Sequence, residues 1–509
     1  MFIRRDKIEE REYQKNIFES AKDTNTLVVL PTGLGKTVIS VLILDYRLSK
    51  YKGSKALFVA PTKPLVNQHY KTFSNLMTID INTISGEVLK SERKNIYETS
   101  QLVIATPQTI ENDMEDSLID FSDFSLLVVD EAHHTIGNYA YVKIAKEFIK
   151  NSKYPLIIGL SASPASDQEK INLVCRNLGI SKVEIRGEDD PDVSKYVKTK
   201  TVEEVRLVLP KEIMELTNRL RLFIQEQIAA LQNVGLMKDA AMSKINRRTI
   251  LMLQKSLQRR MFSGNKNFYT IRGIIITSKL LKLYHALGLL STQSLAGFRN
   301  FLEKIIEEGT SKTDKELANS QEVKWLEERA TKLLEDGVEH PKLAAMARIL
   351  SESFRPDQKA IIFTQYRDTV DIIYKYLESI KGLRPVRFIG QGNGGLKQKE
   401  QISIIKDFEA GVYNILVSTS VSEEGISIKG ADLAIFYETI PSGIRSIQRR
   451  GRVGRFNAGK IFILITEGTT DEGYYWLSKR KESRMKKLIK KIKDNPDSLK
   501  NDGTLGSFV

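Results

Sequence analysis

Three short segments, far apart in the chain, carry the residue types that nucleotide hydrolysis requires. They are Pro31-Thr32-Gly33-Leu34-Gly35-Lys36-Thr37, Asp130-Glu131-Ala132-His133 and Gln448-Arg449-Arg450-Gly451-Arg452-Val453-Gly454-Arg455. The first has glycines that let the backbone aim N–H groups at phosphate oxygens, followed by a lysine that can reach the terminal phosphates. The second supplies carboxylates and the third supplies guanidinium groups. Together they predict an ATP-hydrolysing motor that works on nucleic acid.

The first segment has the strand–loop–helix setting of a phosphate-binding loop. It follows the apolar run Leu27 to Leu30 and precedes a helix-like stretch from Val38 to Ser49. Leu30 stands where the generic Walker pattern has its first glycine. We expect ATP to be contacted by Thr32, Gly33, Leu34, Gly35, Lys36 and Thr37, and we expect Thr37 also to bind Mg²⁺.

The second segment places two carboxylates directly after the apolar run Leu126 to Val129. In a parallel sheet that position is the carboxyl edge, where open α/β folds bind ligands. We expect Asp130 to bind the metal and Glu131 to polarise the attacking water. Two solvated loop acids are the alternative for such a pair, and the phosphate loop upstream makes catalysis the stronger interpretation. His133 is either a coupling residue or a satisfied polar side chain.

The third segment carries Arg452 and Arg455 three residues apart, with Gln448 one helical turn earlier, so one helix face can present all of them. Permanently charged, planar guanidinium groups suit the charge that develops on a transferring phosphoryl group. A solvated basic helix face is the alternative, and the Gly-Arg-Val-Gly-Arg core favours catalysis. We therefore expect Arg452 and Arg455 to act at the γ-phosphate and Gln448 to belong to the same catalytic set.

In its order of motifs the chain resembles the superfamily 2 helicases, and the resemblance covers nearly everything outside one insertion. It implies that Gln14 reads the adenine, that Gly425 contacts the nucleotide and that Ser161-Ala162-Ser163 links hydrolysis to domain movement. The residues that it implies for contacts with the strand backbone are Thr62, Lys63, Thr106, Gln365 and Thr419. Ser427 departs from the aspartate that many relatives carry after Gly-Ile.

Within that superfamily the motif sequences resemble those of the archaeal Hef and eukaryotic FANCM group, which remodels forks and junctions. Dicer and RIG-I-like helicases share much of it, so an RNA-directed motor is the alternative, and a non-hydrolysing scaffold is a remote one. Hef proteins often add a nuclease with a Glu-Arg-Lys signature. Glu92-Arg93-Lys94 occurs here inside the first motor domain, and we interpret it as a charged helix without nuclease activity.

Length and composition agree with a large nucleic-acid-binding protein. A chain of 509 residues exceeds one hydrophobic core, so two or three domains are expected. The net charge of +15 favours a polyanionic partner. The single cysteine, Cys175, cannot close an internal disulfide, which suits a cytoplasmic, nucleoid-associated protein. No uninterrupted apolar run approaches the roughly 20 residues of a membrane span, so no membrane partner is expected.

Short β-rich runs alternate with helical stretches in two parts of the chain, which predicts two RecA-like parallel-sheet domains with ATP between them. The expected strands are 27–30, 57–60, 102–105, 126–129 and 156–160 in the first domain, and 360–363, 386–389, 415–418, 433–437 and 461–466 in the second. Helical spacing replaces the alternation between them. The predicted domains are 1–205 (RecA-like), 206–338 (helical insert), 339–480 (RecA-like) and 481–509 (basic helix and tail).

The middle of the insert is strongly basic, and we expect it to contact duplex or junction DNA through Arg247, Arg248, Arg259 and Arg260. A merely solvated basic face is the alternative. Three aromatic residues, Phe262, Phe268 and Tyr269, lie in this stretch, and core packing is favoured for them over stacking on bases.

The last eight residues, Asp502 to Val509, resemble a peptide that binds the sliding clamp (PCNA). Leu505, Phe508 and Val509 have the required spacing, and Asp502 replaces the usual glutamine. A flexible apolar tail is the alternative.

Overall fold

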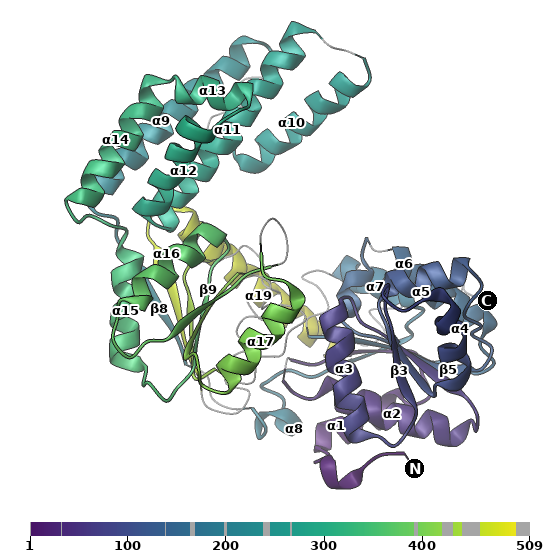
Figure 1. The fold of residues 1–509 in the computed structure, drawn as a ribbon. Helices are drawn as coiled ribbons and strands as arrows, with labels where there is room; N and C mark the ends of the chain where they lie inside the picture. The colour runs from purple at the N-terminus through teal and green to yellow at the C-terminus, as the bar shows by residue number, and fades with distance from the viewer. Residues whose placement is uncertain are drawn as a thin grey trace.

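The computed structural model describes residues 2–31, 33–137, 139–162, 168–197, 201–237, 245–264, 267–390, 395–419, 431–439 and 459–494. They form two parallel β-sheets, each covered by helices, and an all-helical domain that stands on the second sheet (Figure 1). The predicted fold class, two RecA-like domains with a helical insertion, is confirmed.

The first sheet has seven strands in the order β3-β4-β2-β5-β6-β1-β7, all parallel. Their bounds are β1 Thr26–Val29, β2 Lys55–Val59, β3 Ile81–Ile84, β4 Leu102–Ala105, β5 Phe124–Val129, β6 Ile157–Ser161 and β7 Lys182–Ile185. Successive residues of the central strands are buried on opposite faces: Val28 belongs to one core cluster, whereas Leu27 and Val29 belong to the other. Burial on both faces explains why these strands read as continuous apolar runs.

Helices cover both faces of that sheet. One core cluster contains side chains of α1 (Glu12–Ala21), α2 (Lys36–Lys50) and α3 (Lys63–Leu76). The other contains side chains of α4 (Lys90–Thr99), α5 (Pro107–Glu115), α6 (Tyr139–Asn151) and α7 (Gln168–Leu178). A short helix, α8 (Pro191–Ser194), then leads toward the second sheet. The Glu-Arg-Lys triplet lies on α4, where Arg93 is buried and its Nη1 lies 2.6 Å from Asp113 Oδ1, so this arginine has a structural role.

The second sheet has six parallel strands in the order β10-β11-β9-β12-β13-β8. Their bounds are β8 Thr201–Leu207, β9 Ala360–Phe363, β10 Pro385–Phe388, β11 Ile415–Ser418, β12 Leu433–Phe436 and β13 Lys460–Thr466. The first predicted boundary, at residue 205, is wrong, because β8 pairs with β13 along its whole length. The chain therefore enters the second domain before the insert begins. Helices α15 (Pro341–Ser353), α16 (Arg367–Glu378), α17 (Gln398–Glu409) and α19 (Thr470–Asp494) accompany this sheet.

The insert consists of α9 (Lys211–Asn233), α10 (Arg247–Phe262), α11 (Phe268–Thr292), α12 (Leu295–Glu308), α13 (Lys312–Ala318) and α14 (Gln321–Glu335). Helix α9 buries Ile213, Leu216, Leu220, Ile224, Ile228 and Leu231, as helical spacing in the sequence predicts. Helix α11 is the central helix, against which α9, α10, α12 and α13 pack.

Helix α11 is also long and apolar enough to cross a membrane, although charged residues interrupt its apolar sequence. Half of its most apolar window is buried inside the insert. In this structure its apolar side chains therefore form the core of a helical domain.

Candidate ATP and nucleic-acid site

The predicted site residues of the first domain lie along one edge of its sheet, because all seven strands are parallel and their carboxyl ends meet there. The phosphate loop follows β1, Ser161 ends β6 and the Asp-Glu pair follows β5. Thr62 follows β2 and Thr106 follows β4. In the order of the sheet, the residues predicted for ATP therefore lie toward one end of this edge, and those predicted for nucleic acid lie toward the other.

The phosphate loop closes tightly onto α1. Gly35 precedes α2 with φ +76°, and a Cβ there would lie 2.4 Å from Gln14 Nε2, so only glycine fits. The Tyr13 hydroxyl donates to the Leu34 carbonyl at 2.6 Å, and Gln14 Nε2 donates to the same oxygen at 3.3 Å. Gln14 is thus buried against the loop backbone, and the structure does not test its predicted contact with adenine. Thr32 lies outside the described residues.

Lys36 is the first residue of α2, and its ammonium group is buried without a hydrogen bond to any described residue. The Glu131 carboxylate is the nearby counter-charge, at the long distance of 3.9 Å. An unsatisfied cation beside a helix N-terminus is the environment that a phosphate group completes. The residues present therefore fit the triphosphate of ATP.

Glu131 lies between Lys36 and His133 in a left-handed backbone conformation, with φ 48°. Its carboxylate is 3.3 Å from His133 Nδ1, and that nitrogen is also 3.3 Å from Ser161 Oγ. Burial raises the pKa of Glu131, but the charge of Lys36 and the hydrogen bond from His133 outweigh burial and lower it to about 2. Glu131 is therefore ionised at neutral pH, and His133 connects it to the serine that ends β6.

Asp130 is buried beside Glu131 and is held by a residue that the sequence analysis did not identify. His69 Nε2 lies 2.7 Å from Asp130 Oδ2, and both side chains are buried. The His69 ring packs on Phe58, with the ring centroids 4.4 Å apart. His69 lies on α3, the helix that Thr62 precedes and Lys63 begins. Its only sequence signal is a lone histidine on an apolar helix face, which core packing explains equally well.

The carboxylate of Asp130 and the hydroxyl of Thr37 are oxygen ligands of the kind that Mg²⁺ prefers. Asp130 follows β5, and Thr37 is the second residue of α2. The donor set thus fits the predicted metal.

The predicted nucleic-acid residues of the first domain stand at two helix N-termini. Thr62 precedes α3, and Lys63 is the first residue of that helix; Thr106 precedes α5. The Thr62 hydroxyl is buried and has no hydrogen-bond partner among the described residues. Thr106 Oγ1 is 2.9 Å from Thr109 Oγ1, and Lys63 forms an ion pair with Glu87. Because helix N-termini attract phosphate groups, this pair of termini suits a strand backbone.

In the second domain, Gln365 and Thr419 follow the neighbouring strands β9 and β11 at the carboxyl edge of the sheet. Gln365 is exposed, and Thr419 is buried. Gly425, Gln448, Arg452 and Arg455 lie outside the described residues, so their predicted roles remain predictions. The last described residue before the arginine segment is Thr439.

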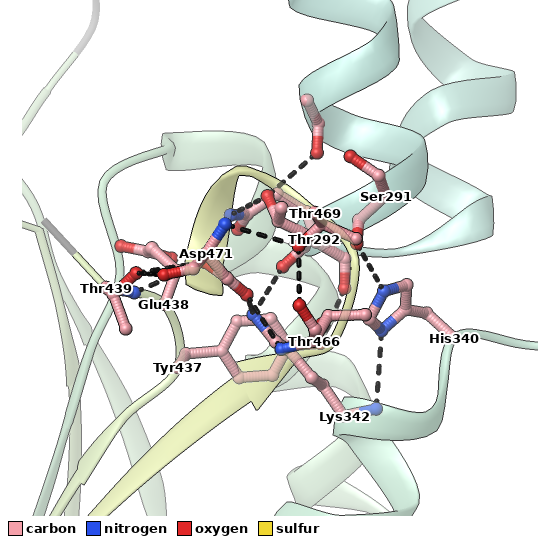
Figure 2. Close-up of polar contacts among 12 residues, drawn as sticks. Ser291, Thr292, His340, Lys342, Tyr437, Glu438, Thr439, Thr466, Thr469 and Asp471 are labelled. Carbon is pink, nitrogen blue, oxygen red and sulfur yellow. Dashed lines mark hydrogen bonds and ion pairs between the residues drawn. The ribbon is translucent and has the colours of Figure 1, made fainter. Parts of the chain in front are cut away.

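A network of buried polar side chains joins the insert to this edge of the second sheet; we call it the base of the insert (Figure 2). Lys342 forms a fully buried ion pair with Asp471 and donates to the Thr292 carbonyl at 2.7 Å. Asp471 also accepts from the Thr439 amide at 3.3 Å. His340 Nε2 lies 3.2 Å from the Ser291 carbonyl oxygen. Residues from the insert, the segment after β12, α15 and α19 thus meet in one place.

A second part of the base connects the insert with the loop that carries Gln365. The Tyr437 hydroxyl donates to the Gln293 carbonyl at 2.8 Å, and the Gln293 side chain accepts from Thr369 at 3.1 Å. The ring of Tyr366 lies 5.3 Å from that of His285 on α11. The insert is therefore attached beside the residues predicted to hold the strand.

The predicted DNA-binding arginines lie on α10, the helix of the insert whose only buried side chains are Ile250 and Leu257. All four are exposed. Burial raises the pKa of Tyr366, and the charge of Arg247 partly opposes that rise. Arg247 therefore lies near the loop that carries Gln365 and Tyr366. The expected core packing of the aromatic residues is wrong: Phe262, Phe268 and Tyr269 are 85%, 72% and 57% exposed.

Three family descriptions match successive parts of this chain. "Type III restriction enzyme, res subunit" matches residues 7–166, and "Helicase conserved C-terminal domain" matches residues 341–457. "Putative ATP-dependent RNA helicase, helical bundle" matches residues 210–336, which is nearly the whole insert. The descriptions that match the insert and most of the second domain both name helicases.

Individual relatives agree. The "Putative ATP-dependent RNA helicase MJ1505" of Methanocaldococcus jannaschii is 40% identical over 95% of this chain and 61% of its own length. The "ATP-dependent DNA helicase MPH1" of Scheffersomyces stipitis is 33% identical over 90% of this chain and 49% of its own length. This chain thus spans less than two thirds of these curated relatives.

A solved structure covers the described architecture more fully. The Pyrococcus furiosus Hef helicase domain is 42% identical, with a TM-score of 0.72, and the match covers 94% of this chain and 100% of that one. The chain therefore belongs to the superfamily 2 helicases, in the group of Hef and the Fanconi anemia group M proteins, and carries the two domains of a nucleic-acid-dependent ATPase.

Proposed function

We propose that this protein is an ATP-dependent DNA helicase or translocase that acts on branched DNA, such as stalled forks and junctions, in the cytoplasm. The observation that carries the proposal is an exposed cationic helix, α10, on an insert that is fixed to the second sheet by a buried base. The motor edge holds a strand through its backbone and reads no sequence. Recognition of branch shape therefore falls to the insert.

Hydrolysis begins with the triphosphate of ATP in the phosphate loop. The buried Lys36 ammonium binds the terminal phosphates, which replace its long contact with Glu131. Glu131, ionised at neutral pH, is then free to accept a hydrogen bond from the attacking water. Asp130, oriented by His69, and Thr37 would hold Mg²⁺, which neutralises phosphate charge when bound. The arginine segment completes the site when the two domains close.

Coupling to the strand follows from contacts within the first domain. Thr62 and Lys63 begin the same helix, α3, that carries His69, so one rigid element connects the strand with the Asp130 carboxylate. His133 connects Glu131 with Ser161. Both acids of the hydrolysis site are thus in contact with residues through which we expect hydrolysis to be coupled to the strand.

The nucleic-acid preference is tested by ATPase rates with single-stranded DNA, duplex, fork, four-way junction and duplex RNA of equal length. We expect forks or junctions to stimulate hydrolysis most. Stimulation by RNA but not DNA would instead establish the RNA-directed alternative, with which the names of the Methanocaldococcus relative and of the helical-bundle family agree. An absence of phosphate release with every polymer would favour a scaffold.

Two substitutions separate binding from turnover. Lys36→Ala removes the cation at the terminal phosphates and is expected to abolish ATP turnover while DNA binding is largely kept. Glu131→Gln is expected to trap bound ATP, since the water is no longer polarised. Filter binding of labelled ATP and DNA distinguishes the two variants.

A clamp-binding role for Leu505, Phe508 and Val509 is part of the proposal, although these residues lie outside the described ones. Deletion of residues 505–509 is expected to abolish binding to a sliding clamp, measured by calorimetry. Unchanged affinity would remove this partner.

A further inference from the structure

The end of α10 and the start of α11 carry three exposed aromatic side chains. Phe262 is the last residue of α10, Phe268 is the first of α11, and Tyr269 follows it. The rings of Phe268 and Tyr269 meet edge to face, with centroids 5.9 Å apart. We call these three residues the aromatic tip. Large apolar side chains gathered in one exposed place mark interaction sites.

The tip lies far from the base of the insert. Helix α11 has 25 residues, so its two ends are about 37 Å apart. Thr292, at its end, lies in the base, whereas Phe268, at its start, lies in the tip. The end of α10 and the start of α11 accordingly lie at the outer end of the insert (Figure 1).

Helix α10 leads to the tip with one cationic face. Arg248, Met252, Lys255, Arg259 and Phe262 recur at intervals of four and three residues and are all exposed. The buried residues Ile250 and Leu257 lie on the opposite face, against α11. The helix contains no acidic residue. Among the described residues, no ion pair involves Arg248, Lys255 or Arg259.

The neighbouring helix shows that pairing is available within this domain. On α11, Arg272 and Lys279 form ion pairs with Glu316, and Lys282 forms one with Asp314, both on α13. Helix α10 thus presents positive charge on its outer face that its own sequence does not neutralise. A polyanion bound along this face would reach the aromatic rings at the end of α10.

We propose that the aromatic tip stacks on nucleobases left unpaired at the branch point, while Arg248, Lys255 and Arg259 follow the phosphates of one arm. Aromatic stacking is tolerant of sequence and strengthens binding about 5-fold to 150-fold per base. Phosphate contacts by themselves do not distinguish a continuous duplex from a branch. The tip thus supplies the preference for a branch, and this inference rests on the proposed function.

The test uses the full chain and a triple variant, Phe262→Ala, Phe268→Ala and Tyr269→Ala. Affinities are measured by fluorescence anisotropy for a fork with unpaired bases at its branch point and for an uninterrupted duplex of equal length. We expect the variant to bind the fork about 10-fold to 100-fold more weakly, because one to two stacked bases are lost. Its affinity for the duplex should stay unchanged.

Two matched variants sharpen the result. Leu222→Ala removes an exposed apolar side chain from α9 of the same insert, and it should leave both affinities unchanged. Arg248→Gln, Lys255→Gln and Arg259→Gln together should weaken binding to fork and duplex alike. These three changes should also reduce the slope of log K against log salt by up to about 3.

A direct readout uses 2-aminopurine at the branch point of the fork. The parent protein should quench its fluorescence through stacking, and the triple aromatic variant should not. Unchanged fork affinity together with an unchanged 2-aminopurine signal would overturn the inference. So would a concentration-dependent dimer, seen by sedimentation and lost in the variant, because the tip would then hold a second copy of this chain.

Failure of the tip is distinguishable from failure of the proposed function. A parent protein that is stimulated by RNA alone, or that does not prefer forks to duplex, contradicts the proposed function. A parent that prefers forks, with a tip variant that does so equally, contradicts the tip alone.

Discussion

The two ends of α11 differ in how their polar and aromatic side chains are placed: they are buried and paired at one end and exposed at the other. At the base, Lys342 and Asp471 are fully buried and paired, and Tyr437 is buried with its hydroxyl bonded. At the tip, aromatic rings and unpaired cations face solvent. A buried charge without a partner is costly, so the base holds a single arrangement. Exposed groups have no such constraint and are available to a ligand.

The comparison indicates which end serves which purpose. The base fixes the insert to the carboxyl edge of the second sheet, beside the loops that carry Gln365 and Thr439. The insert and the second domain should therefore move as one body when ATP closes the motor. The tip then travels with the second domain and changes its distance from the first.

The largest effect is expected from Lys342→Met, which leaves Asp471 buried without its counter-charge. Removing one partner of a buried pair costs about 3–5 kcal/mol of unfolding free energy. Urea unfolding followed by tryptophan fluorescence is suited to this, because Trp325 lies in the insert and Trp476 on α19. The double variant Lys342→Met with Asp471→Leu should recover most of the loss. No loss in the single variant would show that the base does not hold the insert.

A smaller effect is expected from pH. Burial, and then the charge of Lys342, lowers the pKa of His340 to about 3. Unfolding restores the ordinary pKa near 6.5. Between pH 6.5 and pH 3 the unfolded chain therefore binds a proton at His340 that the folded protein does not bind. Stability contributed by the neutral ring is complete above pH 6.5 and is lost as the pH falls, by up to about 1.4 kcal/mol per unit.

Urea midpoints at pH 7, 6 and 5 test this for the parent and for His340→Gln, which cannot titrate. The parent should lose stability more steeply. Glu339, whose pKa burial raises, is present in both proteins, so their difference isolates His340. Parallel pH profiles would contradict the assignment.

Tyr437→Phe should cost about 1 kcal/mol, because the Gln293 carbonyl loses its donor while the ring is kept. Hydrogen exchange at the end of α11 should accelerate, with no change near Phe268. Equal acceleration at both ends would mean that the base does not act locally.

The smallest effect is expected at the tip. Phe262→Ala changes a side chain that is mostly exposed, so unfolding free energy should stay within about 0.5 kcal/mol of the parent value. A loss of several kcal/mol would show that the tip is packed, as the sequence had suggested.

The sequence predicted the central strands of both sheets and missed most of the edge strands. β3 and β7 bound the first sheet and β8 bounds the second, and none of the three forms a continuous apolar run. An edge strand is covered less completely, so it tolerates residues such as Asn82 and Glu203. β8 has mostly exposed residues and was not predicted as a strand. The first predicted domain boundary therefore fell inside it.

Site residues that belong to contiguous motifs were predictable, whereas those defined by tertiary contact were not. Lys36 and Glu131 are identified by the motif residues next to them in the sequence. His69 meets Asp130, 61 positions later in the chain, and Lys342 meets Asp471, 129 positions later. Composition likewise did not reveal that the tip aromatics lie outside the core. Such pairings depend on how elements pack, which local periodicity does not encode.

The position of β8 has a consequence for how such proteins diversify. The helical domain leaves the second sheet after β8 and returns to it before β9, so both of its attachments are to the same sheet. It is an outgrowth of one lobe and does not span the two. Selection can therefore lengthen, shorten or exchange these helices without altering the reach of the chain between the halves of the motor.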